Sequence, residues 1–430
     1  APITVKPATG ATVVINVTPK TYDNQAAIKI DSTQYVTIDG SNSGTSSRDM
    51  AINAIGNLGA RGFSIFNSSH NAVVKNCLVR TGWTAATDSN KFQSIQVTTV
   101  SGGKSCNNVL LENNILRNAH RGISAFGASS ADTAVGFIIR NNVVDSVSTA
   151  AIYTGSAMGS LIYNNDVSIL NSVAAGTTNL YGIYVGGGSD GCRVYNNNVH
   201  DINSVVGGAV VTYGIASNTG AANHGGNVIY NNFVAMDITK SNGTGAIYPL
   251  YVSESTIPDS ILFNTVKLTG SGTGNRTSTA YYKGVSTGNS VVKNNILINL
   301  RTDGTTGIAT AIGRPSSTIA GTVISDYNNL FAGSADTVQH KIGRFSTSFY
   351  FATLAGWATA NVSDGASISE DVQFVSATDL HIKSGVATKL KNAGTPIPGY
   401  TKDIDGQTRN ANTPDIGADE FSGTTDVERS

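Results

Sequence analysis

A short phrase recurs along most of this chain: apolar β-type residues, a polar residue, Asn-Asn and further apolar residues. One copy is GCRVYNNNV, residues 191–199, and successive copies are 23 to 37 residues apart. Aligned on the second Asn, the copies place these residues at the same position: Cys77, Asn114, Asn142, Asn165, Asn197, Asn232, Asn264, Asn295 and Asn329. Each copy predicts a strand, a bend and another strand, which bury their apolar side only when copies stack on one another.

The unequal spacing of the copies favours a β-solenoid with loops of variable length over a helical repeat. A second phrase, a small residue followed by an apolar one, precedes most copies, as in Gly182-Ile183 and Gly214-Ile215. It predicts another strand in every coil, with its apolar residue facing inward. The two phrases together predict an all-β fold, a parallel β-helix of about ten coils spaced ~4.8 Å apart.

Asn at the bend has a physical reason, because Asn tolerates left-handed backbone and its amide can bond to the equivalent Asn of the next coil. We therefore interpret these residues as a structural ladder: Asn114, Asn142, Asn165, Asn197, Asn232, Asn264, Asn295 and Asn329. The alternative is that one of them acts as a ligand or catalytic residue. Cys77 takes the same position, and we expect it to be a buried thiol. The chain has 3 cysteines, an odd number, so we do not expect a disulfide framework.

The two phrases resemble the repeats of right-handed parallel β-helix proteins, the pectate-lyase-like superfamily, over about residues 30–335. The resemblance implies the fold but selects no activity, because this scaffold carries lyases, hydrolases, adhesins and capsule-binding spikes alike. The ending DIDGQTRNANTPDIGADEF, residues 403–421, resembles the C-terminal signature of many secreted bacterial β-helix proteins. The matching residues are Asp403, Asp405, Gly406, Arg409, Pro414, Asp415, Ile416, Gly417, Ala418 and Glu420.

These features predict a domain order. Residues 1–35 form an N-terminal cap that covers the unpaired strand edge, and residues 36–335 form the β-helix. Residues 336–422 form a C-terminal capping region with one short helix, in which Arg409 pairs with Asp415 or Glu420 and Ile416 covers the last coil. Residues 423–430 form a linker-like tail, which resembles the junction before the sorting domain of type IX secretion substrates of Bacteroidota.

Composition points to an extracellular or bacterial cell-surface protein. Charged residues are only 13%, the formal net charge is zero, and the chain starts at Ala1 without an initiator Met, as a processed secreted protein would. Neutrality excludes the overall field that nucleic acid or an anionic membrane would need, and the apolar runs are far shorter than a membrane span. Low charge also predicts that such rods self-associate through their ends or sides into a fibre, because neutral rods resist association poorly.

Two columns of outward residues contain tyrosines. One, two residues before the aligned position, reads Lys75, Glu112, Arg140, Tyr163, Tyr195, Tyr230, Leu262, Lys293 and Tyr327; the other reads Ser124, Tyr153, Tyr184, Ala216, Tyr248, Tyr282 and Ala309. Flat aromatic faces spaced by single coils suit stacking on sugar rings. The candidate glycan-binding residues are Tyr153, Tyr163, Tyr184, Tyr195 and Tyr230. The alternative is that stacked tyrosines only stabilise a parallel sheet.

A group of cations could instead serve catalysis. A β-helix lyase needs a cation to neutralise a uronate carboxylate and a base to take the adjacent proton, and the candidates are Arg117, His120, Arg121 and Arg140. The alternative is an ordinary ladder of surface salt bridges. No cofactor is expected, with calcium at Asp403, Asp405 and Asp415 as the alternative, since hard oxygen ligands gather there.

Two functions follow. The first is a non-catalytic extracellular β-helix that binds an extracellular polysaccharide or a cell-surface glycan, or builds surface structure. The second is a polysaccharide lyase or glycoside hydrolase that works along the helix groove. Against catalysis, the sequence lacks the paired Asp motifs and the Gly-His-Gly of polygalacturonase-like hydrolases. His224 lies in Asn-His-Gly-Gly, which is not that motif.

Overall fold

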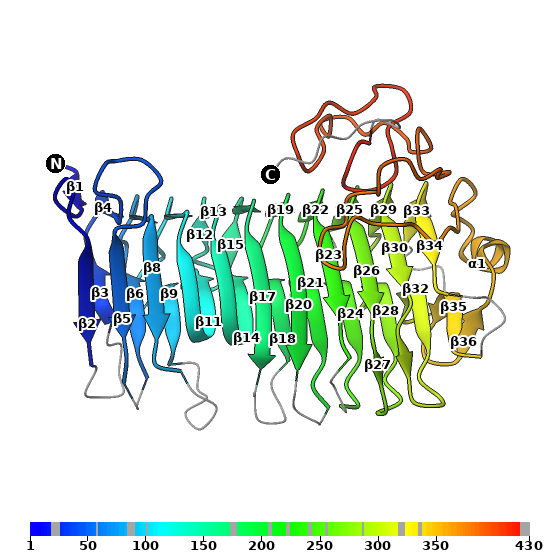
Figure 1. Ribbon diagram of the computed structural model, residues 1–430, viewed down its shortest axis with the longest axis horizontal. Coiled ribbons are helices and arrows are strands. Elements are labelled where there is room, and N and C mark those ends of the chain that lie inside the picture. Colours follow the sequence, from blue (N-terminus) through cyan, green and yellow to red (C-terminus); the bar gives the residue numbers. More distant parts are fainter. Residues whose placement is uncertain are drawn as a thin grey trace.

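The chain folds into a long solenoid of stacked parallel strands, whose long axis is horizontal in Figure 1. The computed structural model describes residues 1–18, 26–56, 59–83, 91–99, 102–172, 179–204, 209–220, 224–239, 243–253, 257–285, 288–316, 323–333 and 338–421. The expected parallel β-helix is therefore confirmed, and so is a single short helix among these residues, α1 (Leu354–Asn361).

Each coil contributes a strand to three stacks. The first stack is an eleven-stranded sheet in strict chain order. Its strands are β1 (Ile3–Val5), β4 (Val36–Asp39), β7 (Val73–Lys75), β10 (Leu110–Glu112), β13 (Ile138–Arg140), β16 (Leu161–Tyr163), β19 (Arg193–Tyr195), β22 (Val228–Tyr230), β25 (Ser260–Leu262), β29 (Val291–Lys293) and β33 (Ile324–Asp326).

The second stack follows the Asn bend. It contains β2 (Val13–Val17), β5 (Met50–Ala54), β8 (Cys77–Thr81), the first half of β11 (Ile115–Phe126), the first half of β14 (Val143–Gly155), β17 (Asp166–Ser172), β20 (Asn198–Ser204), β23 (Phe233–Asp237), β26 (Thr265–Thr269), β30 (Ile296–Asn299) and β34 (Asn329–Phe331).

The third stack closes the coil. It contains β3 (Ala26–Asp31), β6 (Arg61–Phe66), β9 (Gln93–Thr98), the second halves of β11 and β14, β18 (Leu180–Val185), β21 (Thr212–Asn218), β24 (Ile247–Ser253), β28 (Ser278–Lys283), β32 (Ala309–Arg314) and β35 (His340–Phe345). Short pairs at the corners are β12 (Ala134–Val135) with β15 (Ala157–Met158) and β27 (Ser271–Gly272) with β31 (Thr302–Asp303).

The Asn bend divides its work between two adjacent residues. The first, such as Asn113 or Asn196, takes the left-handed backbone with φ of 54° and 52°. The second, such as Asn114, is buried, and its Nδ2 donates at 3.0 Å to Oδ1 of Asn142 in the next coil. The same bond continues through Asn165, Asn197, Asn232, Asn264 and Asn295. This chain of amides sets the vertical register of the coils.

The last expected rung is wrong by one residue. Nδ2 of Asn295 donates at 3.0 Å to Asn328, whereas Asn329 bonds through its side chain to the backbone of Glu370. The reason is that Tyr327 takes the left-handed bend position, with φ of 56°, so Asn328 follows it as the rung. Asp326, and not Tyr327, therefore pairs with Lys293 in the outer column.

The two ends of the rod differ from each other. The N-terminal residues supply β1, β2 and β3, which pair in parallel with β4, β5 and β6 and thus form the first coil. At the other end, β36 (Phe349–Phe351) pairs antiparallel with β35, and α1 packs beside them, with Trp357 fully buried against Gly343 and Phe345. The expected segment boundaries at residues 35, 335 and 422 stay predictions, and the tail from residue 422 lies outside the described residues.

The C-terminal segment, residues 365–421, lies along the side of the rod over β22, β25, β29 and β33 (Figure 1). Ile416 and Phe374 pack with Phe233, Ile296 and Ile298 from the outward face of the second stack. The expectation that Ile416 covers the last coil is therefore wrong, because its apolar partners belong to the lateral surface. Arg409 pairs with Glu420, as one of the two expected options, at 3.4 Å.

None of the helical segments in the described residues has the length and hydropathy of a membrane span.

The interior of the rod is a hydrophobic core built from the inward residues of all three stacks. In the eleven-stranded sheet, the fully or almost fully buried positions repeat once per coil: Val74, Leu111, Ile139, Ile162, Val194, Ile229, Ile261 and Val292. Outward positions of the same strands are free for other chemistry.

Candidate functional site

The outward face of the third stack carries a cluster of tyrosines, which we call the tyrosine surface. It consists of Tyr153, Tyr181, Tyr184, Tyr213, Tyr248, Tyr251 and Tyr282, on β14, β18, β21, β24 and β28. All are half-buried. Parallel register places them in two files, because a residue and its counterpart in the next coil are direct neighbours.

The first file comprises Tyr181, Tyr213 and Tyr248, and the second pairs Tyr153 with Tyr184 and Tyr251 with Tyr282. Sequence reasoning missed three of these residues and placed one in the wrong file. It overlooked the first file because it followed only the residue after the inward Ile. The signal was present in YGI, YGI and YPL, where a Tyr two residues before the inward residue faces outward as well.

Tyr248 was expected in one file with Tyr282, but the backbone register aligns Tyr251 with Tyr282 and Tyr248 with Tyr213. The rings of Tyr248 and Tyr282 nevertheless stack, with centroids 4.9 Å apart. The reason is that Leu250, and not Ile247, aligns with the inward Ile215 of the preceding coil. The expected frame was thus shifted by three residues in this coil. Both tyrosines still face outward, so the shift enlarges the tyrosine surface.

The rings of the tyrosine surface contact one another in mixed geometries. Tyr181 and Tyr213 stack with centroids 4.9 Å apart and planes 4° apart, whereas Tyr213 and Tyr251 meet edge to face at 5.0 Å. Burial raises the pKa of Tyr184 and Tyr213 well above the ordinary value. The phenols of these two residues therefore keep their protons, and a protonated phenol can donate a hydrogen bond as well as accept one.

An arginine lies at each end of the tyrosine surface. The Arg121 guanidinium lies 4.2 Å from the ring centroid of Tyr153, and that of Arg344 lies 4.3 Å from Tyr282. Arg344 also donates to the Tyr248 hydroxyl at 3.3 Å and to Thr279 Oγ1 at 3.0 Å. Such cation–π contacts order the rings and leave a cation at either end of the aromatic face.

The eleven-stranded sheet carries the second aromatic array, which we call the tyrosine column. Tyr163, Tyr195 and Tyr230 stack with centroids 4.7 and 4.8 Å apart and planes 7° and 9° apart. Tyr400 of the C-terminal segment packs edge-on against Tyr230 at 5.0 Å. Burial raises the pKa of Tyr230 to about 12. The structure thus brings together these candidate glycan-binding residues, on a different face from Tyr153 and Tyr184.

The four lyase candidates do not form one site. Arg140, on the eleven-stranded sheet, lies with Nε 2.7 Å from Glu112 and donates to the Tyr163 hydroxyl at 2.7 Å. Arg117, on the second stack, holds Asp145 at 2.7 Å. Arg121 lies on the third stack, and His120 is a buried residue at the corner before it. The strands carry them to separate faces of the coil, because each coil turns twice between them.

The second stack holds a histidine between coils that sequence reasoning did not single out. His200 lies 2.8 Å from both Asp166 and Asp201. Burial acts to lower its pKa, but the hydrogen bonds to the two carboxylates outweigh burial and raise it. The arrangement favours a protonated imidazole that links neighbouring coils. Its signal was VHD, a His and an Asp in consecutive positions after the ladder.

The three calcium candidates have different surroundings. Asp403 is fully buried and its two oxygens accept backbone N–H groups, among them those of Gln407 and Glu420. Asp415 likewise accepts from the backbone of Asn392 and Phe421, and burial raises its pKa to about 6. Their lone pairs therefore hold the C-terminal segment together. The structure does not gather the two around a common cation position.

The third candidate belongs to another group. Asp405 lies 2.8 Å from Nε2 of His381, and Nδ1 of the same ring lies 2.5 Å from Asp379. His381, Asp405 and Asp419 place one potential ligand atom each within 4.8 Å of the others. Burial would lower the pKa of His381, but Asp405 and Asp379 raise it to about 9. The site residues fit an imidazolium held by carboxylates, and the ring also packs edge-on against Phe233 at 4.8 Å.

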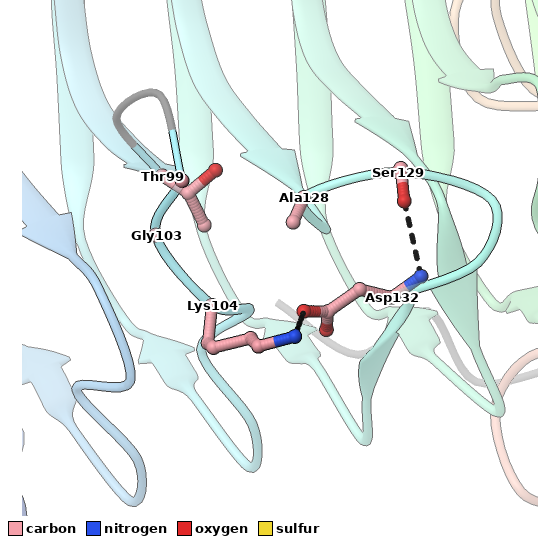
Figure 2. A pocket seen from close by; sticks show the side chains of 7 residues that line it. Thr99, Gly103, Lys104, Ala128, Ser129 and Asp132 are labelled. Carbon is pink, nitrogen blue, oxygen red and sulfur yellow. Dashed lines mark hydrogen bonds and ion pairs between the residues drawn. The ribbon is translucent and has the colours of Figure 1, made fainter.

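An open hollow lies next to the tyrosine surface. It is lined by Thr99, Gly102, Gly103, Lys104, Ala128, Ser129 and Asp132. Figure 2 shows Lys104 reaching across it to Asp132, with an Nζ–Oδ2 distance of 3.3 Å. Ala128, one of the lining residues, follows Phe126 by two positions, and the Phe126 ring lies 5.3 Å from that of Tyr153. Since Lys104 is largely exposed and already paired, the hollow offers only shallow polar contact.

No protein-family model matches the chain, and no curated protein is detectably similar to it. Several solved structures are similar in fold. The Azotobacter vinelandii mannuronan C-5 epimerase AlgE6 A-module is 12% identical, covers 86% of this chain and 92% of its own, and has a TM-score of 0.43. A variant of the periplasmic alginate epimerase AlgG is 12% identical over 66% of this chain and 70% of its own, with a TM-score of 0.40.

The GH136 lacto-N-biosidase from Eubacterium ramulus is 11% identical over 73% of this chain and 57% of its own, with a TM-score of 0.41. These proteins share with this chain a solenoid architecture and no more. The activity of this chain has to be argued from its own surface, because one such scaffold carries many unrelated functions.

Proposed function

We propose that this protein is a non-catalytic glycan-binding β-helix of the extracellular space or the bacterial cell surface. An extended polysaccharide lies along the tyrosine surface, with its sugar rings on the aromatic faces and its hydroxyls on the phenols. The single observation that carries this proposal is the set of half-buried tyrosines side by side on five neighbouring strands.

The geometry supports an extended ligand over a compact one. The tyrosine surface runs from β14 to β28, which is four strand steps and therefore about 19 Å at ~4.8 Å per step. Aromatic side chains with a polar tip bind ligands that are apolar on one face and hydroxylated at the edge, as sugar rings are. A rigid platform also saves the entropy of ordering side chains on binding.

The tyrosine column is a second candidate surface for the same ligand class. Its rings are more regular, but its end is closed by Tyr400, and Arg140, which donates to the Tyr163 hydroxyl, is paired with Glu112. Self-association of the rods also stays a proposal. It follows from the low charge and is tested by sedimentation at rising concentration, where a constant mass would contradict it.

Binding to a glycan array, followed by titration with the best oligosaccharide, tests the main proposal. We expect Tyr213→Ala to weaken binding by about 3- to 10-fold, since an aromatic contact of this kind contributes about 0.5 to 1.5 kcal/mol beyond the area that it buries. Tyr195→Ala in the tyrosine column is the matched control and should bind within about 2-fold of the unaltered protein. The reverse pattern would move the ligand to the tyrosine column, and unaltered binding in both variants would reject both surfaces.

A polysaccharide lyase is the second candidate, and one observation favours it. Unlike Arg117 and Arg140, Arg121 forms no ion pair within the described part of the chain, so its charge is available to a uronate. Incubation with polyuronates, followed by the ultraviolet absorbance of unsaturated products, decides between the two. Sustained turnover that Arg121→Gln abolishes would establish the lyase and overturn the non-catalytic proposal.

A further inference from the structure

The tyrosine surface ends in a polar patch on the side of the first coils. We call it the polar end and define it by Ser64, Gln96, Arg121 and Ser124, on β6, β9 and β11. Ser64, Gln96 and Ser124 occupy the same outward file as Tyr153, one coil after another. Arg121 occupies the neighbouring file, which continues through Ala150 to Tyr181. The aromatic face and the polar end are therefore one continuous surface.

The polar end is unusual in its hydrogen bonding. Ser64 Oγ, Gln96 Oε1, Arg121 Nε and Ser124 Oγ are each buried and bond to no residue that the structure describes. Ser124 is 1% exposed. Buried polar groups nearly always have partners, and each orphan costs about 1 to 3 kcal/mol. Four orphan groups on adjacent outward positions mark a place where partners are supplied from outside the chain.

The charge of Arg121 leads to the same conclusion. Burial lowers its pKa, and among the residues that the structure describes Arg121 forms no ion pair with a carboxylate. On the same strand, four residues earlier, Arg117 holds Asp145 with an Nε–Oδ2 distance of 2.7 Å. A desolvated guanidinium without a counter-ion is costly, and an anion that enters its site gains both the charge interaction and charge-assisted hydrogen bonds.

Arg344, at the opposite end of the tyrosine surface, differs in this respect. Its guanidinium donates to Thr279, Ser346 and Tyr248, which are all neutral but which satisfy its donors. Of the two ends of the tyrosine surface, the Arg121 end is therefore the one whose buried polar groups have no hydrogen-bond partner among the described residues. Because the chain has no net charge, this attraction is local and would not steer anions from a distance.

We propose that Arg121, with Ser124 and Gln96, forms a subsite for the anionic substituent of an acidic sugar whose neighbouring rings lie on Tyr153 and Tyr184. This inference rests on the proposed glycan-binding function and narrows the ligand to an acidic polysaccharide. The anionic group is a carboxylate, as in a uronate, or a sulfate. The guanidinium donates to its oxygens, and the Ser124 hydroxyl donates a further hydrogen bond.

A matched set of oligosaccharides tests the subsite by calorimetric titration at physiological salt. The set contains an oligouronate, the same oligomer with its carboxyl groups reduced to alcohols, and a sulfated oligosaccharide. We expect either the oligouronate or the sulfated oligomer to bind at least about 10-fold more tightly than the reduced one. Which of the two binds better identifies the anionic group.

Two arginine variants on β11 complete the test. Arg121→Gln should remove the preference for the anionic oligomer, and Arg117→Gln should keep it. Arg121→Lys, which keeps the charge but loses the planar donors, should keep only part of the preference and covers the case in which Arg121→Gln does not fold. Equal affinity for the oligouronate, the sulfated oligomer and the reduced oligomer overturns the subsite but leaves the glycan proposal standing. Absence of binding to the whole set overturns both.

Discussion

The two tyrosine arrays of this molecule look alike in sequence and differ in their surroundings. In the tyrosine column the rings are nearly parallel, the adjoining Arg140 is paired with Glu112, and Tyr400 covers the end. In the tyrosine surface the rings meet at mixed angles, and the adjoining Arg121 forms no ion pair with any acid in the described ranges. Regular stacking thus follows from the repeat itself. Buried polar groups without hydrogen-bond partners among the described residues are the feature that indicates a ligand.

The ladder explains why the tyrosine column is so regular. Asn165, Asn197 and Asn232 each donate from Nδ2 to the carbonyl oxygen of the tyrosine two residues earlier, at 3.0 to 3.1 Å. Every ring of the tyrosine column is therefore tied to a fixed bend. The described part of the third stack has no comparable Asn ladder, and β11 shifts register between Ala119 and Arg121, at the corner that leads into this stack. Its side chains are free to adopt the tilted contacts that the tyrosine surface shows.

The largest effect that we expect comes from breaking this tie. Asn197→Ala removes the acceptor of Asn165 and the donor to the Tyr195 carbonyl, and leaves their partners buried. Because each orphan costs about 1 to 3 kcal/mol, the free energy of unfolding should fall by roughly 2 to 4 kcal/mol in urea titrations. Asn198→Ala is the neighbouring control and should cost about 1 kcal/mol or less. Equal losses would show that the ladder does not set the register.

A smaller difference separates the two arginines. Arg140→Gln leaves Glu112 without its cation and should lower the free energy of unfolding by about 1 kcal/mol, because the pair is partly exposed. Arg121→Gln removes a buried charge without a counter-ion and should change stability by less than about 0.5 kcal/mol, or increase it. Thermal and urea unfolding of both variants measure this contrast. A clear loss in Arg121→Gln would mean that the arginine stabilises the fold, and that its role is not reserved for a ligand.

The smallest effect concerns the C-terminal segment, whose Tyr400 closes the end of the tyrosine column. The pKa of His381 is raised from 6.5 to about 9 in the folded chain, so its stabilisation is complete below 6.5 and is lost as the pH rises through about 9. Asp415, with a pKa raised to about 6, acts in the same direction at lower pH. We expect the C-terminal segment to be cleaved faster by proteases at alkaline than at neutral pH.

His381→Asn is the control for this pH dependence, since it removes the titrating group and should show little change in cleavage between about pH 6 and 9.5 after correction for protease activity. The accompanying signal is exposure of Tyr230, on which Tyr400 packs. The tyrosine surface, which the C-terminal segment does not contact through any described bond, should bind its ligand equally at both pH values. A parallel loss of ligand binding would contradict the separation of the two regions.

The β-helix fold, the Asn ladder, the tyrosine column and part of the tyrosine surface could be predicted from the sequence, because they follow from the alternation of inward and outward residues along each strand. A residue two before a ladder Asn faces outward in every coil, so Tyr163, Tyr195 and Tyr230 could be placed without coordinates. It failed where the frame shifts by one or three residues, at Asn328 and at Tyr251. Such shifts leave the composition of a coil unchanged, and only hydrogen bonds to the next coil reveal them.

By itself the sequence determined that the chain stacks parallel coils on an Asn ladder, because a bend of this kind can bury its amides only against copies of itself. Only the tertiary structure decided what lies beside each coil. It placed the C-terminal segment on the flank, although the same apolar residues would suit the end of the rod. It also left Arg121 without an ion pair in the part of the chain that is described, since ion pairing depends on distances between strands and faces that repeat spacing does not contain.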